Sequence, residues 1–388
     1  MPDSTAPASP ATPSDAQPFP DDLPPVKPPS AGFILQLFVV PAVIVAALFI
    51  PAVLLKNLVK TELDVNNLVE ELQHPNEHRR WRAAHGLAQA LKADQELGTE
   101  NQHLSENKPV ATKLAALLDE ELKRDLGHDE AKADPSLKFQ AFLARTLGLF
   151  DLPDVVLPVL ETAIRMDHSQ ETGELRLNKL EVRKNALSSI MVIADRAHTR
   201  GSPLHSPELV AVLEEVSQDR EPLVREVTAY TLAVLQDEQG ANRLVQMLVD
   251  ADYLVRVNAA VGLTRAGDTR GLETLLEVLS LAHGSYPDTL KKWNALSRGA
   301  EPQKATPEDG RDTTHELSLF LSLKNSILAL ERVSPKLSDK ERAAALAALK
   351  PIAANFTETN IRHLAVTMLP RIEHPEEKPA NLAPVNRE

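Results

Sequence analysis

A single residue spacing recurs along this chain and constrains its fold more than any other feature. In the stretch DADYLVRVNAAVGL, Arg256 follows an apolar residue, Val255, and precedes the small residues Ala259 and Ala260 and then Leu263. Positions three, four and seven residues apart lie on one face of an α-helix, and adjacent small residues let a second helix approach closely. The spacing therefore predicts an amphipathic helix that packs against a partner helix.

The same frame occurs in several other places, and an arginine holds the same position in most copies. Gln140 replaces the arginine in one copy, and a degenerate copy of the frame lies around Leu323. The arginines of the frame are Arg80, Arg183, Arg225, Arg256 and Arg362. Only the step from Arg225 to Arg256 is close to a minimal repeat of about 30 residues, and loops lengthen the others. Because the frame is repeated, we interpret these arginines as structural residues rather than as a binding site.

An acidic residue precedes the arginine position by six residues in three copies, as Asp134, Asp219 and Asp250. With this order of Asp, Val-Arg, Ala-Ala and Leu, the sequence resembles the HEAT-repeat family in its short bacterial form, the PBS-lyase-type HEAT-like repeats. The resemblance covers most of residues 64–371 and is most specific between 219 and 280. It implies an all-α fold, a right-handed α-solenoid of about six to eight helix pairs. It also implies that Asp and Arg side chains of successive repeats hydrogen-bond along the stack.

The copies depart from the family pattern at several positions. Gln140 replaces the arginine, Thr228 occupies an alanine position, and no acidic residue precedes Arg183 or Arg362 at the expected place. We therefore expect interruptions in the ladder of Asp and Arg side chains. Where the ladder is present, its arginines are expected to be partly buried against carboxylate or carbonyl partners.

The composition favours helices and excludes several kinds of chemistry. Hydrophobic residues make up 43% of the 388 residues and aromatic residues only 4%, so the core is built from aliphatic side chains, which suits close-packed helices. The chain has no cysteine, which excludes disulfides, thiolate nucleophiles and cysteine-ligated metals. Its net charge of −13 argues against general nucleic-acid binding, because phosphate contacts need a surplus of Lys and Arg.

The chain divides by composition into four parts. Residues 1–31 are rich in proline and predict a disordered tail, and residues 376–388 predict a disordered C-terminal tail. Residues 32–58 predict one transmembrane helix. Residues 59–375 form the predicted helical repeat domain.

The transmembrane prediction rests on residues 33–55, which carry no charge. As a helix this run would span about 35 Å, enough to cross a bilayer core. We therefore expect a single-pass membrane location. Lys56 and Lys60 follow the run and favour the cytoplasmic side for the large domain.

No motif predicts a metal site, a cofactor site or a catalytic site. His74 and His78 are four residues apart with Glu77 between them, but Pro75 starts the helix after His74 and no third ligand is indicated. The sequence has no glycine-rich phosphate loop and no nucleophile motif. We expect a protein that is not an enzyme and that binds no cofactor and no metal.

The most informative segment outside the repeat frame is residues 283–312, a predicted inserted loop of about 30 residues. Its candidate partner-contact residues are Tyr286, Lys291, Lys292 and Trp293. Long loops with an aromatic residue and charges are frequent contact sites. The alternative is that Trp293 sits on a short helix that folds back and covers the solenoid. The loop at 167–179 is a second and weaker candidate.

These observations favour a membrane-tethered helical-repeat scaffold that binds a protein partner along its concave face or through its inserted loops. The alternative is a catalytic or non-catalytic subunit of an enzyme complex, because some chains with repeats of this bacterial type resemble phycobilin lyase components. DNA binding is the least favoured class, since it needs a basic groove. The sequence identifies neither the partner nor the oligomeric state.

Overall fold

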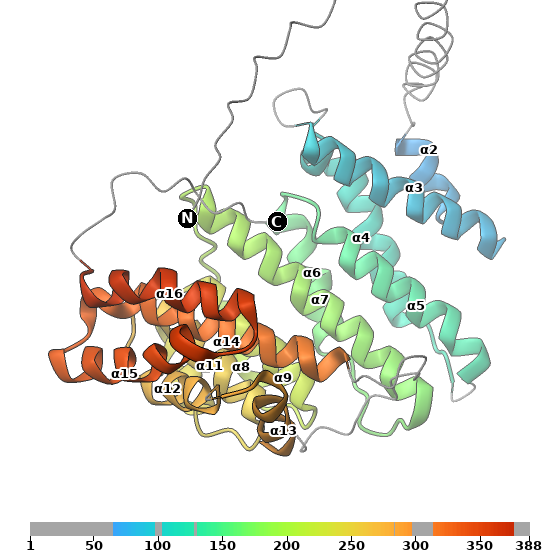
Figure 1. The fold of residues 1–388 in the computed structure, drawn as a ribbon. Helices are drawn as coiled ribbons and strands as arrows, with labels where there is room; N and C mark the ends of the chain where they lie inside the picture. The colour runs from blue at the N-terminus through green and yellow to red at the C-terminus, as the bar shows by residue number, and fades with distance from the viewer. Residues whose placement is uncertain (1–64, 98–102, 128–129, 283, 297–312, 376–388) are drawn as a thin grey trace, which may run out of the picture. The chain divides into compact units, whose positions relative to one another are not determined.

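The computed structural model describes residues 65–97, 103–127, 130–282, 284–296 and 313–375, all of them in one compact unit, Asp64–Glu388. Figure 1 shows the helices in chain order. The α-helices of these ranges are α2 (Val65–Glu71), α3 (Glu77–Glu96), α4 (Lys108–Lys123), α5 (Glu130–Leu147), α6 (Pro153–Ile164), α7 (Gly173–Thr199), α8 (Pro207–Val216), α9 (Pro222–Leu235), α10 (Glu238–Met247), α11 (Tyr253–Arg265), α12 (Leu272–Leu281), α13 (Tyr286–Leu296), α14 (Thr313–Val333), α15 (Asp339–Asn355) and α16 (Thr359–Glu373). The described ranges contain no strand, which confirms the all-helical class.

Local sequence signals explain where these helices begin. The Asn76 side chain accepts a hydrogen bond from a backbone N–H in the first turn of α3, and Asp252 does the same for α11. Ser338 and Glu341 form a reciprocal capping box at the start of α15. Prolines stand in the first turn of α6, α8 and α9, where a missing N–H costs no helical hydrogen bond.

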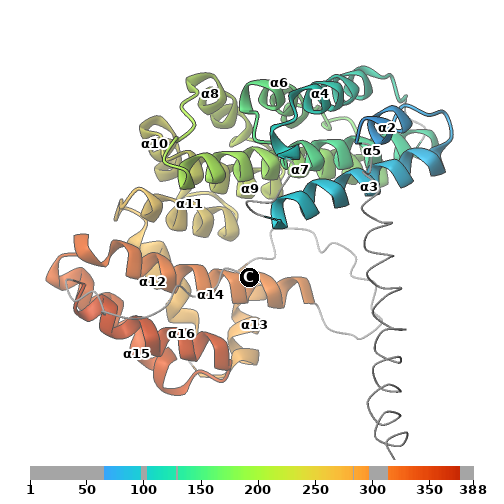
Figure 2. The same ribbon diagram turned by 90° about the horizontal axis from the view of Figure 1, so that it is seen from above.

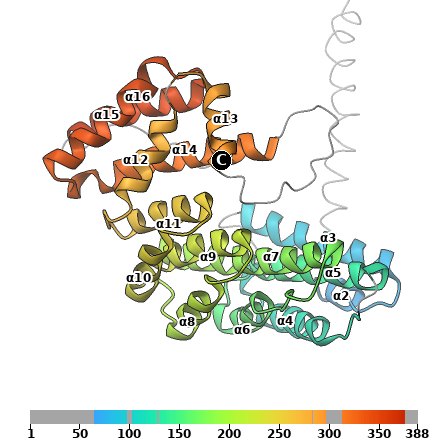
Figure 3. The same cartoon turned by 90° about the horizontal axis from the view of Figure 1, so that it is seen from below.

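The helices from α2 to α11 form five consecutive pairs. The first helices of these pairs are α2, α4, α6, α8 and α10, and the second helices are α3, α5, α7, α9 and α11. The second helices from α5 onward pack against one another in sequence, and the first helices make their own succession of contacts. Figures 2 and 3 show the two layers that result. This arrangement leaves one side of the second helices outside the core.

The pairing continues beyond α11 with one interruption. Helix α14 takes the second-helix position, because it packs on α11 and α12, while α15 and α16 form the last pair. Helix α13 packs on α12 and α14. The degenerate copy of the frame lies in α14, where Leu323, Ile327 and Leu330 are buried. With α13 set aside, the described helices make seven pairs, which lies within the predicted range.

Helix α11 connects two hydrophobic cores. Val255 and Ala259 belong to the core of the preceding pairs, whereas Tyr253 and Val257 belong to the core formed with α12 to α16. A helix that is apolar on all sides is buried on all sides. The stretch that defined the frame is therefore the helix that joins the two halves of the repeat domain.

The segment predicted as an inserted loop contains a helix, α13. Thr289 and Trp293 lie one turn apart on it and are fully buried, and the Thr289 hydroxyl donates to the Leu281 carbonyl at 3.2 Å. The helix agrees with the alternative interpretation of this segment, in which Trp293 sits on a short helix. Residues 297–312 of the same segment lie outside the described residues.

The prediction of a single-pass membrane location is corrected. Among the residues that the structure describes, no helix combines the length and the apolar character needed to cross a bilayer. The longest helices that the structure describes, α7 and α14, carry charged side chains along their length. Such helices lack the continuous apolar run that a bilayer core requires. The apolar run at 33–55 and both predicted tails lie outside the described residues.

Candidate interaction surface

Two frame arginines, Arg225 and Arg256, bind the backbone of the preceding turn in the same way, and Arg225 also binds a carboxylate. The Nε and Nη2 atoms of Arg225 donate to both carboxylate oxygens of Asp250 at 2.8 Å, and Nη1 donates to the Asp219 carbonyl at 2.9 Å. Arg256 donates to the Asp250 carbonyl at 2.7 Å, and its guanidinium carbon lies 4.8 Å from the centre of the Tyr253 ring. Each guanidinium thus bonds the carbonyl six residues earlier.

Arg183 extends the pattern to the preceding helix pair. Its Nη1 lies 2.7 Å from a carboxylate oxygen of Asp219, and its Nε donates to the Ile164 carbonyl at 2.7 Å. No acidic residue was needed six positions before Arg183, because the carboxylate comes from the following pair. The interruption expected at this step is therefore absent.

The two aspartates each serve two purposes. Besides binding an arginine, Asp219 accepts a hydrogen bond from the Glu221 N–H, and Asp250 accepts one from the Asp252 N–H, both at 2.8 Å. Each carboxylate thereby fixes the turn between two helices and ties that turn to the neighbouring pair. We call Arg183, Asp219, Arg225, Asp250 and Arg256 the Asp–Arg ladder.

The remaining copies of the frame lie outside this ladder. Gln140 donates to the Glu121 carbonyl at 2.8 Å. Arg362 donates at 2.9 Å to the carbonyl six residues earlier, so it keeps the backbone half of the pattern. Arg80 lies with its guanidinium carbon 5.2 Å from the centre of the Phe139 ring. The ladder is therefore confined to the central pairs.

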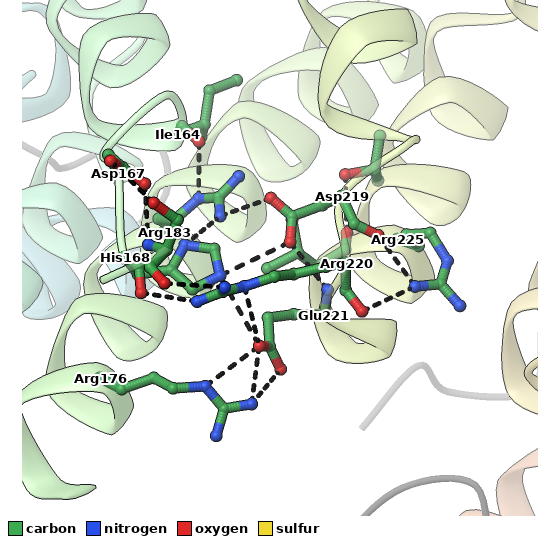
Figure 4. Close-up of polar contacts among 12 residues, drawn as sticks. Ile164, Asp167, His168, Arg176, Arg183, Asp219, Arg220, Glu221 and Arg225 are labelled. Atoms are coloured by element: carbon green, nitrogen blue, oxygen red, sulfur yellow. Dashed lines mark hydrogen bonds and ion pairs between the residues drawn. The ribbon is translucent and has the colours of Figure 1, made fainter. Parts of the chain in front are cut away.

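The loop between α6 and α7 is held against the next pair by further arginines, as Figure 4 shows. Arg176 donates to both carboxylate oxygens of Glu221 at 2.6 Å. Arg220 donates to the carbonyls of His168 and Ser169 at 2.7 and 2.9 Å. These contacts give the loop at 167–179 a structural role.

His168 lies at the centre of this cluster with only 5% of its side chain exposed. Arg183 Nη1 lies 2.8 Å from its Nδ1, and because a guanidinium only donates, Nδ1 accepts and the ring proton belongs on Nε2. Nε2 faces Asp219 and Glu221 at 3.6 and 3.8 Å. Burial and the Arg183 charge lower the pKa of His168.

A groove lies on the second-helix face, by which we mean the exposed side of α3, α5, α7, α9 and α11. Its lining residues are Trp81, Leu137, Lys138, Ala141, Phe142, Arg145, Asn178, Glu181 and Asn185. Trp81 packs edge-on against Phe142 and Phe139, with ring centres 5.8 and 5.9 Å apart. None of the frame arginines lines the groove, so the structural arginines and the groove are separate features.

The candidate contact residues on α13 differ in exposure. Trp293 is fully buried and packs edge-on against Tyr253 with 5.3 Å between ring centres, so it offers no surface to a partner. Tyr286 donates its hydroxyl to the Glu316 carbonyl at 2.9 Å. Lys291 and Lys292 are exposed. The alternative interpretation, in which a short helix covers the solenoid, describes the position of Trp293.

His74, just before α3, is held by hydrogen bonds within its own turn. His74 Nδ1 accepts from the Asn76 N–H at 3.0 Å, and its Nε2 lies 2.8 Å from Arg79 Nη1. Both ring nitrogens of His74 are thus engaged by its own turn. Across the residues that the structure describes, no group of three or more His, Cys, Asp or Glu side chains could hold a metal ion.

One titratable residue on the second helices was missed in the sequence. Burial and the nearby Asp252 charge raise the pKa of Glu226 to about 7, against the lowering effect of the hydrogen bond that Asn258 donates at 3.2 Å. Glu226 directly follows a frame arginine, at a position where the copies share no residue type. Its environment comes from α11, so no local pattern indicates it.

Comparison with known protein families identifies the class of fold. The family model described as HEAT repeats matches residues 206–287, which include α8 to α12. The expected resemblance is confirmed for this part of the chain. The described part of the chain is thus a helical fold that contains HEAT repeats. No curated protein matches the chain.

Several solved structures are similar to the chain at low identity. The Escherichia coli protein YibA is 15% identical with a TM-score of 0.37, over 80% of this chain and 93% of that one. An engineered protein is 17% identical with a TM-score of 0.32, over 68% and 97%. Human deoxyhypusine hydroxylase in complex with glycerol is 16% identical with a TM-score of 0.27, over 82% and 99%. Likeness at this level carries no conclusion about function.

Proposed function

We propose that this chain is a non-catalytic scaffold that binds a protein partner through its second-helix face. Stacked helix pairs present a long surface without a catalytic constellation, which supports a binding role. The observation that supports this most is a difference between the ladder arginines and the exposed side chains of α7. The ladder arginines are engaged within the scaffold, whereas α7 exposes Leu177 and Val192 to 45% and 39%.

The position of these two residues supports the proposal further. Leu177, Glu181, Asn185 and Val192 follow one another at helical spacing and lie on one face of α7. Large apolar side chains held on a rigid surface beside polar ones are typical of contact sites. The exposed Lys291 and Lys292 on α13 form a second, smaller part of the proposed contact surface.

Affinity purification of the tagged full chain from its own cells, after chemical crosslinking, tests the proposal. We expect the wild type to capture a partner, and the Leu177→Glu, Val192→Glu double variant to lose it at an unchanged melting temperature. Val249, 85% exposed in the turn before α11, gives the matched control Val249→Glu, which should keep the partner. Equal partner yield from all three proteins would contradict a binding role for α7, and Lys291→Glu, Lys292→Glu tests α13 in the same way.

A further inference from the structure

The guanidinium groups of Arg225 and Arg256 have the same contacts on one edge. In each, Nη1 donates to the carbonyl six residues earlier, at 2.9 and 2.7 Å, and to the carbonyl five residues earlier, at 3.2 and 3.3 Å. These bonds fix each side chain in the same orientation relative to its own turn. The inner edges of the two groups, which carry Nη1, are therefore equivalent.

The outer edges, which carry Nε and Nη2, differ between the two arginines. In Arg225 these nitrogens donate to both carboxylate oxygens of Asp250 at 2.8 Å. In Arg256 they have no acceptor among the residues that the structure describes. Neither nitrogen is buried, so the edge is open to a ligand. Arg256 thus presents a carboxylate-binding fork without a carboxylate from the described helices.

The sequence explains why the ladder ends at Arg256. Asp219 and Asp250 each precede a frame position by six residues and lie in the turn between the two helices of a pair. In the next copy, around Leu323, the residue six positions earlier is Leu317. Leu317 has no carboxylate, is 57% exposed and lies within α14 rather than in a turn. The next helix pair therefore gives Arg256 no ladder carboxylate.

The open edge of Arg256 is held in place by the scaffold itself. Its guanidinium carbon lies 4.8 Å from the centre of the Tyr253 ring, and that ring is buried edge-on against Trp293. An arginine fixed on its inner edge and on one face loses little side-chain freedom when it binds a carboxylate. The site is therefore formed before a ligand arrives.

The acids around Arg256 are engaged elsewhere. Asp250 binds Arg225 with both oxygens, and Asp252 accepts the N–H groups of the first turn of α11 at 2.9 and 3.2 Å. Glu277 of α12 is near enough to affect the pKa of Tyr253, but it makes no ion pair with Arg256. Within the part of the chain that the structure describes, no carboxylate competes for the open edge.

We propose that the open edge of Arg256 binds an aspartate carboxylate in a turn of another polypeptide. The turns of the ladder define this ligand, because Asp219 and Asp250 each accept the N–H two residues later and bind an arginine of the neighbouring pair. A partner turn with an acid, any residue and a second acid would continue the ladder by one step. The site contains neither Leu177 nor Val192 and does not depend on the proposed function.

Saturation-transfer NMR of the full chain with unlabelled peptides tests the inference. The probe acetyl-VDADYG-amide copies the turn at Asp250, and the matched probe acetyl-VNADYG-amide has asparagine in place of its first aspartate. We expect the aspartate probe to bind at least about fivefold more tightly, because a neutral amide cannot replace a charge-assisted pair of hydrogen bonds.

Variants assign the binding to the fork. Arg256→Gln should abolish the difference between the two probes, and Arg256→Lys should reduce it although the charge is kept, because lysine has no fork. Arg270→Gln is the matched control, since it removes the same charge from the next turn but its fork already binds Asp268. This control should bind both probes like the wild type. Melting temperatures of the variants exclude unfolding as the cause of a loss.

Three results would overturn the inference: no binding of the aspartate probe, equal binding of both probes, or an Arg256→Gln variant that prefers the aspartate probe as strongly as Arg270→Gln does. The proposed function is tested separately. Capture of a partner through Leu177 and Val192 by a chain that fails the peptide test would retain the scaffold and reject only the site at Arg256.

Discussion

Arg225 joins two helix pairs, because its guanidinium binds the Asp250 carboxylate of one turn and the Asp219 carbonyl of the turn before it. We expect Arg225→Ala to lower the free energy of unfolding by about 2–3 kcal/mol, since a carboxylate with 13% exposure loses its partner. Arg270→Ala is the control, because its arginine is 50% exposed, and it should cost less than about 1 kcal/mol. Urea unfolding measures both, and equal losses would show that the ladder is not structural.

His168 makes stability depend on pH in the acid range. Its pKa in the folded chain lies below the ordinary value of 6.5, so the unfolded chain binds the proton more readily. Its contribution is complete above pH 6.5 and is lost as the pH falls through the lowered pKa. His168→Asn keeps an acceptor for Arg183 without titrating. Urea midpoints between pH 7 and 5 should therefore fall more steeply for the wild type, and parallel profiles would contradict this assignment.

Glu226 makes stability depend on pH in the opposite direction, so that its contribution falls as the pH rises. Its pKa is raised from 4.5 to about 7, so the folded chain binds the proton more readily than the unfolded chain. Its contribution is complete below pH 4.5 and is lost as the pH rises through about 7. Glu226→Gln should gain stability relative to the wild type over this rise. A constant difference between the two proteins in thermal unfolding from pH 4.5 to 7.5 would rule out the raised pKa.

At the scale of the helix, Gly262 sets how closely α11 approaches α9. A Cβ atom there would lie 2.6 Å from the Ala233 methyl group, too close for any side chain. We expect Gly262→Ala to cost about 1–3 kcal/mol through overpacking. Gly86 on α3 has only a leucine end at 3.4 Å, so Gly86→Ala should gain about 0.5–1 kcal/mol from helix propensity. Chemical denaturation measures the change in stability of both variants. An unchanged stability of Gly262→Ala would show that α11 can move away from α9 without cost.

Much of this helical arrangement follows from local sequence, and some of it does not. The frame around Arg256 predicted a helix with buried Ala259 and Ala260, because apolar spacing and small residues are local signals. The contact of Arg183 with Asp219 of the next pair is of the kind that the family resemblance implies, but no local pattern around Arg183 indicates it. The groove was missed for the same reason, because α3, α5 and α7 each supply only part of its lining.

At the scale of the whole molecule, α11 joins the two halves of the repeat domain, because residues on its two sides belong to two different hydrophobic cores. The ladder ties the central pairs at their turns, and the Asp195–Arg265 contact at 2.5 Å links α7 to α11. These contacts tie the second helices α7, α9 and α11 to one another.

Site-specific photo-crosslinking in cells tests this binding role most directly. A photoreactive phenylalanine analogue replaces Asn185 or Tyr230 on the second helices and, for comparison, the exposed Lys113 or Ala211 on the first helices. The account predicts one crosslinked partner band from both second-helix positions and none from the first-helix positions. Crosslinks of equal yield from both sets, or from the first helices alone, would contradict it.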